Sequence, residues 1–239
     1  MKNFIKNKLL SLLYFIEVYF KPRIRNKTSP IDIYYENLSL DCYKFFEKEM
    51  KNSSIFLKPT DIRKFAISQS LKKSNTSNDL FLEFGVFRGD SINLFSEFLR
   101  KKNLTIYGFD SFDGLEEEWS MNEYNPIGTF SLNKKKPKVS NNVKLIVGKV
   151  QETLENFLKE NYGKKITFAH LDMDTYTPTK FTLEKIKPLL NKGSILLFDQ
   201  FYGFPNWQDH EFKAFKEVFK EGEYRYIAFC ESEVAIEML

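Results

Sequence analysis

The stretch Phe81-Leu-Glu-Phe-Gly-Val-Phe-Arg-Gly-Asp90 decides the fold. It opens with an apolar run that predicts a buried strand, turns at Gly85 and Gly89, and leads into a segment whose apolar residues have helical spacing. Strand, glycine turn and helix form the first unit of a doubly wound, nucleotide-binding sheet. Glycines let the backbone approach a ligand, and the helix start offers free N–H groups to anionic atoms. The pattern also occurs in turns that bind nothing, so the rest of the chain must support it.

The next apolar run, residues 104–109, supports a nucleotide because it ends on Asp110, 21 positions after Gly89. An acid about 20 residues beyond the glycine turn can accept hydrogen bonds from both ribose hydroxyls. The alternative is that Asp110 only starts a loop, a position that Asp favours. The sequence has no G-x-G-x-x-G motif, which argues against a dinucleotide.

Two later apolar runs predict adjacent parallel strands, and polar residues follow each of them. The carboxyl ends of such strands meet at one sheet edge, where ligands bind. Two carboxylates brought that close repel each other unless a cation or a proton separates them. Because oxygen ligands suit Mg²⁺, we expect a metal site there. The candidate ligands are Asp172 after residues 166–171 and Asp199 after residues 195–198, while Asp174 either faces a substrate or caps the next helix.

The chain resembles class I S-adenosylmethionine-dependent methyltransferases, and more specifically the macrocin O-methyltransferase (TylF-type) branch. The likeness runs from about Leu80 to Phe219, and its motifs follow the family's order. They are Glu83-Phe-Gly-Val-Phe-Arg-Gly89, Phe109-Asp-Ser-Phe-Asp-Gly-Leu115 and Leu171-Asp-Met-Asp-Thr-Tyr176. The resemblance implies methylation of a sugar hydroxyl with S-adenosylmethionine and a divalent metal, Mg²⁺. The resemblance also implies a third metal ligand directly after Asp199, where the branch has Asp or Asn; this chain departs from it with Gln200, whose amide oxygen can coordinate a metal.

The resemblance also implies a set of cofactor contacts. Its glycine loop surrounds the methionine part of the cofactor, and the acid after the second strand holds the ribose. The loop after the third strand borders the adenine. The implied contacts are Glu83, Gly85 and Gly89 for the methionine part, Arg88 and Ser91 for its carboxylate, Asp110 for the ribose, Ser111 and Phe112 for the adenosine, and Gly148 to Gln151 for the adenine.

Methyl transfer to an alcohol needs a group that takes the hydroxyl proton. The candidates are Asp172 and His210, and His170 is the weaker one because it lies within a strand. The aromatic loop 201–210 either stacks on a sugar ring or packs on the domain. Residues 120–142 show no periodic pattern, and we interpret them as a mobile lid over the acceptor.

Two other functions compete with methyl transfer. Asp172-Met-Asp174 is a D-x-D sequence, which metal-dependent glycosyltransferases use to hold nucleotide-sugar phosphates. The glycine turn and Asp110 argue against that alternative. The other is a non-catalytic, membrane-associated binding protein that keeps the fold but has lost metal chemistry through Gln200.

The 239 residues predict an α/β protein with a Rossmann-like, doubly wound, mostly parallel seven-stranded sheet. Residues 224–229 and 234–238 predict a closing hairpin that ends in an antiparallel strand. We expect an N-terminal helical extension over residues 1–76 and a cofactor-binding domain over residues 77–239. Cys42 and Cys230 have no metal or redox spacing, which suits reduced thiols in the cytoplasm.

The net charge of +4 comes from the N-terminus, because residues 1–28 carry +6 and the remainder −2. A nucleic-acid partner is therefore not expected, since its binding domain would be basic. Leu9 to Phe20 is too short to cross a bilayer, which needs roughly 20 apolar residues. Two interpretations remain for residues 1–28: a helix that packs on the domain or on a second subunit of a homodimer, or an in-plane anchor at the inner membrane surface.

Overall fold

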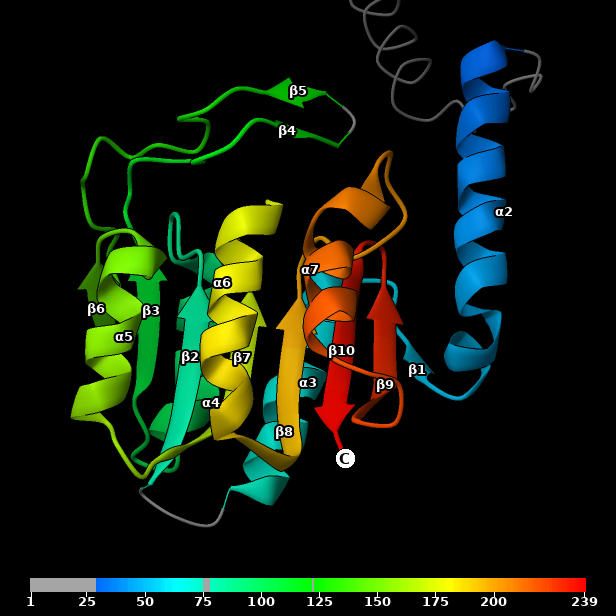
Figure 1. The fold of residues 1–239 in the computed structure, drawn as a ribbon. Coiled ribbons are helices and arrows are strands. Elements are labelled where there is room, and N and C mark those ends of the chain that lie inside the picture. Colours follow the sequence, from blue (N-terminus) through cyan, green and yellow to red (C-terminus); the bar gives the residue numbers. More distant parts are fainter. Residues whose placement is uncertain (1–28, 75–77, 122) are drawn as a thin grey trace, which may run out of the picture. The chain divides into compact units, whose positions relative to one another are not determined.

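The computed structural model describes residues 29–74, 78–121 and 123–239. Its central feature is an eight-stranded sheet in the order β1-β9-β10-β8-β7-β2-β3-β6 (Figure 1). Every neighbouring pair is parallel except the two pairs that β10 makes. The strands of this sheet are β1 (Ser54–Ile55), β2 (Asp79–Phe84), β3 (Ile106–Asp110), β6 (Val143–Val147), β7 (Lys165–Leu171), β8 (Leu190–Phe198), β9 (Tyr224–Cys230) and β10 (Glu233–Met238).

Helices cover both faces of the sheet, as a doubly wound fold requires (Figure 1). Helices α3 and α4 lie on one face, and α5, α6 and α7 lie on the other. The helices are α2 (Pro30–Lys51), α3 (Pro59–Lys73), α4 (Asp90–Arg100), α5 (Val150–Glu160), α6 (Tyr176–Ile186) and α7 (Glu211–Val218), with short 3₁₀ turns η1 (Lys187–Leu189) and η2 (Trp207–Asp209). The predicted fold class and the closing hairpin are therefore confirmed.

The sheet has one strand more than the seven predicted. This strand, β1, pairs in parallel with β9 at the sheet edge. It is two residues long and both residues are exposed, so it carries no alternation of apolar and polar residues that a sequence pattern could reveal.

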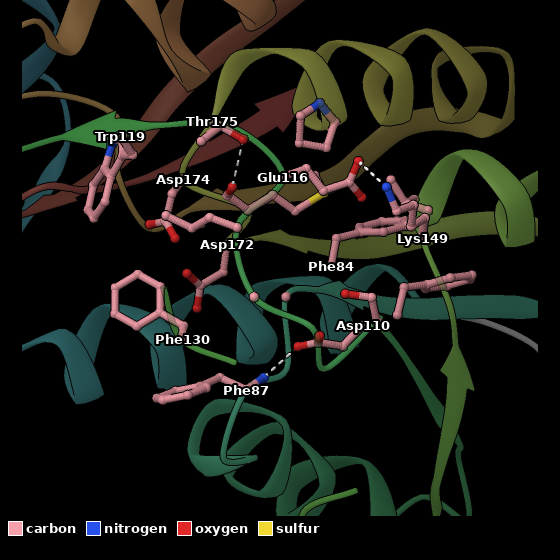
Figure 2. Close-up of a pocket in the computed structure, with 18 of the residues that line it drawn as sticks. Phe84, Phe87, Asp110, Glu116, Trp119, Phe130, Lys149, Asp172, Asp174 and Thr175 are labelled. Carbon is pink, nitrogen blue, oxygen red and sulfur yellow. Dashed lines mark hydrogen bonds and ion pairs between the residues drawn. The ribbon is translucent and has the colours of Figure 1, made fainter. Parts of the chain in front are cut away.

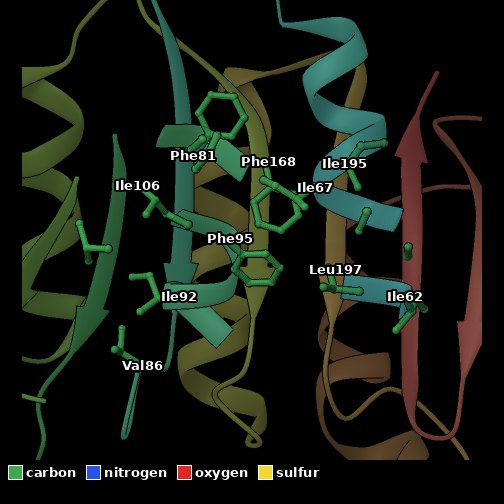
Figure 3. Packing of buried hydrophobic residues seen from close by; sticks show 14 of the residues in the cluster. Ile62, Ile67, Phe81, Val86, Ile92, Phe95, Ile106, Phe168, Ile195 and Leu197 are labelled. Carbon is green, nitrogen blue, oxygen red and sulfur yellow. The ribbon is translucent and has the colours of Figure 1, made fainter. Parts of the chain in front are cut away.

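Apolar side chains from several strands of the sheet and from α3 and α4 form the core between the sheet and these two helices (Figure 3). Phe81 and Phe168 come from neighbouring strands, and Phe95 of α4 packs edge-on against Phe168 with ring centroids 5.0 Å apart. Ile62 and Ile67 of α3 are fully buried in the same cluster. Helix α3 is thus part of the core beneath the sheet. The division of the chain at residue 76 stays a prediction.

By its contacts the chain divides into residues 1–40 and residues 41–239. Of the first unit the structure describes the start of α2, where the Ser39 hydroxyl donates to the carbonyl oxygen of Tyr35 at 2.8 Å. The predictions for residues 1–28 lie outside the described residues. No helix in the described ranges is long and apolar enough to cross a membrane.

The strand register brings the sequence-predicted residues to one edge. Phe84 pairs with Phe109 of β3 and with Leu171 of β7, and Leu171 pairs with Phe198 of β8. The next residue along each of these four strands is therefore Gly85, Asp110, Asp172 or Asp199. Parallel pairing alone places them side by side at the carboxyl edge.

Candidate active site

A pocket of about 270 Å³ opens at this carboxyl edge (Figure 2). Six of the twelve predicted cofactor contacts line it, as do all three predicted metal ligands. These lining residues are Gly85, Asp110, Ser111, Gly148, Lys149 and Val150, and then Asp172, Asp199 and Gln200. The pocket is formed by segments that the sheet brings together from positions 84 to 200.

The glycine turn holds β2, β3 and β7 in close contact. The Gly85 N–H donates to the carbonyl oxygen of Phe109 at 2.9 Å. Gly85 has φ +88°, and a Cβ atom at this position would lie 1.7 Å from the carbonyl oxygen of Asp172. Only glycine fits so close an approach of two backbones. The turn therefore shapes the pocket floor.

Asp110 binds the backbone of the glycine turn. Its Oδ2 accepts hydrogen bonds from the N–H groups of Val86 at 2.8 Å and Phe87 at 2.7 Å, and its Oδ1 accepts one from Phe112 at 2.6 Å. A carboxylate oxygen has two lone pairs, so Oδ1 keeps one for a further donor. Asp110 lines the pocket, which leaves that lone pair available to a ribose hydroxyl. The ribose contact itself stays a prediction.

Replacing Asp110 by Ala should weaken the binding of S-adenosylhomocysteine about 100-fold, because three backbone donors and the ribose contact lose their acceptor together. Isothermal titration calorimetry measures this. Asp113→Ala is the matched control, because Asp113 is an exposed acid in the same loop. The affinity of this variant for S-adenosylhomocysteine should stay at the wild-type value. An unchanged affinity of the Asp110→Ala variant would remove the ribose assignment.

Glu83 and Ser91, both predicted cofactor contacts, lie behind the pocket rather than in its lining. Glu83 is fully buried, and the Ser91 hydroxyl donates to its Oε1. His170 Nδ1 lies 3.5 Å from the same oxygen. Burial raises the pKa of Glu83 to about 8 and lowers the pKa of His170 to about 3, so both side chains are neutral at pH 7. The pair supports the glycine turn from below.

Replacing Glu83 by Gln should make stability less dependent on pH. The unfolded chain loses the Glu83 proton near pH 4.5 and the folded chain near pH 8, so the folded state binds more protons in between. Wild-type stability therefore falls as the pH rises through this window, by on the order of 5 kcal/mol from this group. The amide cannot ionise, and the variant should gain stability over wild type at pH 8. Urea unfolding at pH 5 and pH 8 measures this, with the exposed Glu97→Gln as control; parallel pH profiles for wild type and Glu83→Gln would contradict it.

Four further predicted cofactor residues also lie outside the pocket lining. The Arg88 guanidinium packs over the ring of Phe87, 4.9 Å from its centroid. Gly89 is the N-cap of α4 with φ +86°, and Phe112 is buried in the core. Gln151 donates through Nε2 to Glu116 at 3.3 Å. Their roles toward a cofactor stay predictions, and the structure gives each of them a packing or turn-forming role.

Sequence reasoning missed several lining residues, among them Glu116 and Phe87. The Glu116 side chain forms an ion pair at 3.5 Å with Lys149, which lies within the implied adenine-contact range 148–151. Phe87, Trp119 and Phe130 add aromatic faces on the other side of the pocket (Figure 2). Phe130 of the segment 120–142 lines the pocket, and the role of this segment as a mobile lid stays a prediction. Nothing local in this segment indicates which side chains face the ligand.

Acidic side chains gather at the end of the pocket formed by β7 and β8. Burial and the neighbouring Asp199 raise the pKa of Asp174 to about 7, and burial followed by the charge of Asp199 raises the pKa of Asp172 as well. The pKa of Glu211, which is fully buried, is raised by burial and by Asp174. Asp174 also adopts the uncommon φ of 61°, and such strain is often found at functional sites. This charge arrangement suits the binding of a cation or a proton.

The donor atoms at this edge fit a divalent cation. Oxygen or nitrogen atoms of His170, Asp172 and Asp199 lie within 4.8 Å of one another. Gln200 donates through Nε2 to Asp199 Oδ2 at 2.9 Å, and its own Oε1 is buried without a hydrogen-bond partner among the described residues. An orphaned amide oxygen beside two carboxylates is the ligand set that a hard cation takes.

His210 and the aromatic loop lie away from the pocket lining. The His210 ring stacks on Phe204 with centroids 6.5 Å apart, and burial lowers its pKa. Phe201 is fully buried and contacts Phe46 of α2. For loop 201–210 the structure thus shows packing on the domain. The aromatic side chains that line the pocket are instead those of Phe84, Phe87, Phe109, Trp119 and Phe130.

A glycine turn, an acid after the second strand and a cluster of acids opposite them define a nucleotide-binding α/β enzyme. A family model described as a methyltransferase domain matches residues 82–201, half of the chain. The chain belongs to this methyltransferase family, and it is a class I enzyme that depends on S-adenosylmethionine. No curated protein matches the sequence. Membership of this methyltransferase family argues against the glycosyltransferase alternative.

Solved structures share the fold. CalS11, a calicheamicin methyltransferase, has a TM-score of 0.61 at 22% identity, covering 87% of this chain and 93% of its own. The O-methyltransferase NovP has a TM-score of 0.57 at 17% identity, covering 75% of this chain and 78% of its own. Both likenesses cover more of this chain than the matched family model does.

Proposed function

We propose that this chain transfers the methyl group of S-adenosylmethionine to a hydroxyl of a sugar or glycan precursor, as in the TylF-type branch. One observation carries the proposal: the glycine turn with Asp110 and the cluster around Asp172 face the same pocket. The first group suits the donor and the second suits an oxygen nucleophile. Holding two reactants in line supplies roughly 7–11 kcal/mol of the barrier.

In the reaction, a lone pair of the acceptor oxygen attacks the methyl carbon while the carbon–sulfur bond breaks. S-adenosylhomocysteine leaves as a neutral thioether, and the hydroxyl proton passes to a carboxylate. We assign this proton to Asp172, which lines the pocket at the acidic end. Its raised pKa makes it a better proton acceptor than an exposed carboxylate. His210 is less suited because it lies outside the pocket lining.

A divalent metal, with Mg²⁺ as the expected ion, belongs to the proposal because the donor atoms fit one. Asp172, Asp199 and Gln200 would hold it. When bound, it lowers the pKa of an acceptor hydroxyl. The excess of buried acids at this edge provides the negative charge that such an ion requires.

The aromatic wall supports a sugar as the acceptor. Trp119, Phe130 and Phe87 present ring faces to the pocket, and ring faces suit the apolar face of a sugar. Trp119 is buried, and its Nε1–H has no hydrogen-bond partner among the described residues. A buried donor of this kind is suited to a ligand oxygen. CalS11, which shares the fold, is described as a TDP-rhamnose 3'-O-methyltransferase.

The test combines binding and turnover. Calorimetry with S-adenosylhomocysteine, with and without Mg²⁺, should show binding in both cases. Incubation with methyl-labelled S-adenosylmethionine and a panel of nucleotide sugars and free glycosides should then label a hydroxyl, and EDTA should suppress labelling. Binding without transfer to any member of the panel would count against a sugar acceptor. Label on a nitrogen or carbon of the product would overturn O-methylation.

A further inference from the structure

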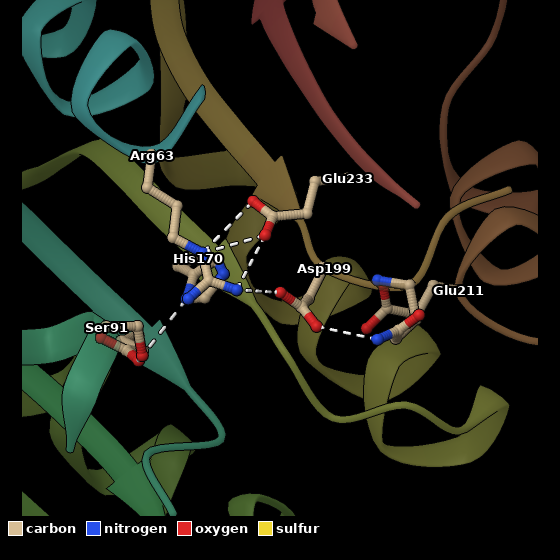
Figure 4. Close-up of polar contacts among 8 residues, drawn as sticks. Arg63, Ser91, His170, Asp199, Glu211 and Glu233 are labelled. Atoms are coloured by element: carbon tan, nitrogen blue, oxygen red, sulfur yellow. Dashed lines mark hydrogen bonds and ion pairs between the residues drawn. The ribbon is translucent and has the colours of Figure 1, made fainter. Parts of the chain in front are cut away.

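Arg63 of α3 lies between two acids that belong to distant parts of the chain (Figure 4). Its Nε donates to Glu233 Oε1 at 3.0 Å, and its Nη2 lies 2.7 Å from the same oxygen and 2.5 Å from Asp199 Oδ1. The exposed fractions are 20% for the Arg63 side chain, 14% for Asp199 and 3% for Glu233. Charge-assisted pairs with so little exposure to water are strong and well oriented.

The strand register explains why a cation is needed at this position. Val234 of β10 pairs with Phe198 of β8, so Glu233 and Asp199 follow as the next opposed residues on neighbouring strands. Like charges directly opposite each other destabilise a sheet. Arg63 removes that repulsion by pairing with both. Burial disfavours its charge, but the two acids outweigh burial and raise the pKa of Arg63.

The ion pair also restricts Asp199. Arg63 contacts Oδ1, and the Gln200 amide donates to Oδ2 at 2.9 Å, so both carboxylate oxygens have a partner. Asp199 lines the pocket, whereas Arg63 does not. A carboxylate held at both oxygens has one orientation, and that orientation sets where its remaining lone pairs point.

We propose that Arg63 is a positioning residue that fixes the orientation of the Asp199 carboxylate at the acidic end of the pocket. The inference rests on the proposed function, which gives Asp199 its role toward a metal. It assigns helix α3, which precedes the glycine turn in the chain, a direct part in organising the site. A purely structural role, as counterion of Glu233 alone, is the alternative to be excluded.

The decisive variant removes both the cation and the acid that would be left unpaired. Arg63→Met alone should lower the melting temperature strongly, because Glu233 and Asp199 are then left facing each other. The double variant Arg63→Met/Glu233→Gln should recover most of that stability. Its Asp199 should still adopt a new side-chain orientation in a crystal structure with S-adenosylhomocysteine, and Mn²⁺ binding by calorimetry should weaken about tenfold.

Three controls accompany the double variant. Glu233→Gln alone keeps the Arg63 contact with Asp199 and should keep both the orientation and the Mn²⁺ affinity. Arg63→Lys keeps the positive charge but lacks the planar guanidinium. It should therefore keep most of the wild-type stability, whereas the orientation of Asp199 should change. Lys64→Met removes an exposed charge one position along α3 and should change nothing. S-adenosylhomocysteine affinity should stay within about twofold of wild type in every variant that folds.

An Asp199 orientation and an Mn²⁺ affinity that match wild type in the double variant would overturn the positioning role. The positioning role would also be overturned if Arg63→Lys had the wild-type Asp199 orientation and the wild-type Mn²⁺ affinity. A wild-type protein that binds no Mn²⁺ contradicts the metal in the proposed function, and the crystallographic orientation of Asp199 then decides the role of Arg63 by itself. The two failures are therefore distinguishable.

Discussion

Gly85→Ala should abolish the binding of S-adenosylhomocysteine. The added methyl carbon would lie 1.7 Å from the Asp172 carbonyl oxygen, well inside any tolerated contact. The carbon is bonded directly to the Cα atom of residue 85 and the oxygen belongs to the Asp172 backbone, so neither atom can swing aside. The turn must therefore open, which separates β2 from β7 and moves Asp172 away from the pocket. We expect no measurable heat in calorimetry at concentrations that saturate the wild type, together with a lower melting temperature.

Gly163→Ala is the matched control for this substitution. Gly163 has φ +84°, close to the +88° of Gly85, and a Cβ atom there would meet nothing within 4 Å. The control therefore carries the same backbone penalty, about 1–2 kcal/mol, without the collision. It should bind S-adenosylhomocysteine as wild type does. An affinity of Gly85→Ala within about threefold of the control would mean that the pocket is not built on this turn.

Asp172→Asn should lower kcat by about 10³-fold while leaving S-adenosylhomocysteine affinity near the wild-type value. The amide keeps the shape of the side chain but cannot take the hydroxyl proton, and it is a poorer ligand for a cation. Stability should rise rather than fall. Burial and the charges of Asp199 and Asp174 raise the pKa of Asp172, so its ionised form destabilises the fold as the pH increases.

This combination of lost activity and gained stability separates a chemical role from a structural one. The measurements are initial rates of methyl transfer, calorimetry with S-adenosylhomocysteine, and thermal unfolding at pH 8. Asp209→Asn, an exposed acid after the loop at the end of β8, serves as the control and should behave as wild type. A kcat above about a tenth of the wild-type value would exclude Asp172 as the proton acceptor.

The parts of the site that the sequence predicted correctly share a simple origin. Gly85, Asp110, Asp172 and Asp199 each directly follow a buried strand, and parallel strands necessarily end at the same edge. Their positions follow from apolar periodicity and strand order, both of which are visible locally along the chain. The same holds for the doubly wound sheet and its closing hairpin.

The direction in which each side chain points was harder to predict from the sequence. Glu83 is one residue from the pocket edge, yet its side chain turns under the glycine turn to Ser91. Within a strand, alternation assigns a residue to a face, but which face covers a ligand depends on the helix packed there. Loop 201–210 has the aromatic composition of a binding surface and instead packs around Phe46, a residue more than 150 positions earlier.

The sequence by itself determined the order of strands and helices, the glycine turn, and the acids that end three strands, because these depend on local spacing and backbone preference. Only the tertiary structure decided that Arg63 meets Asp199 and Glu233, and that Trp119 and Phe130 close the pocket. Such contacts join segments separated by tens to more than a hundred residues. They arise when burial of the core sets the packing of helices and loops on the sheet, and no local pattern along the chain encodes that packing.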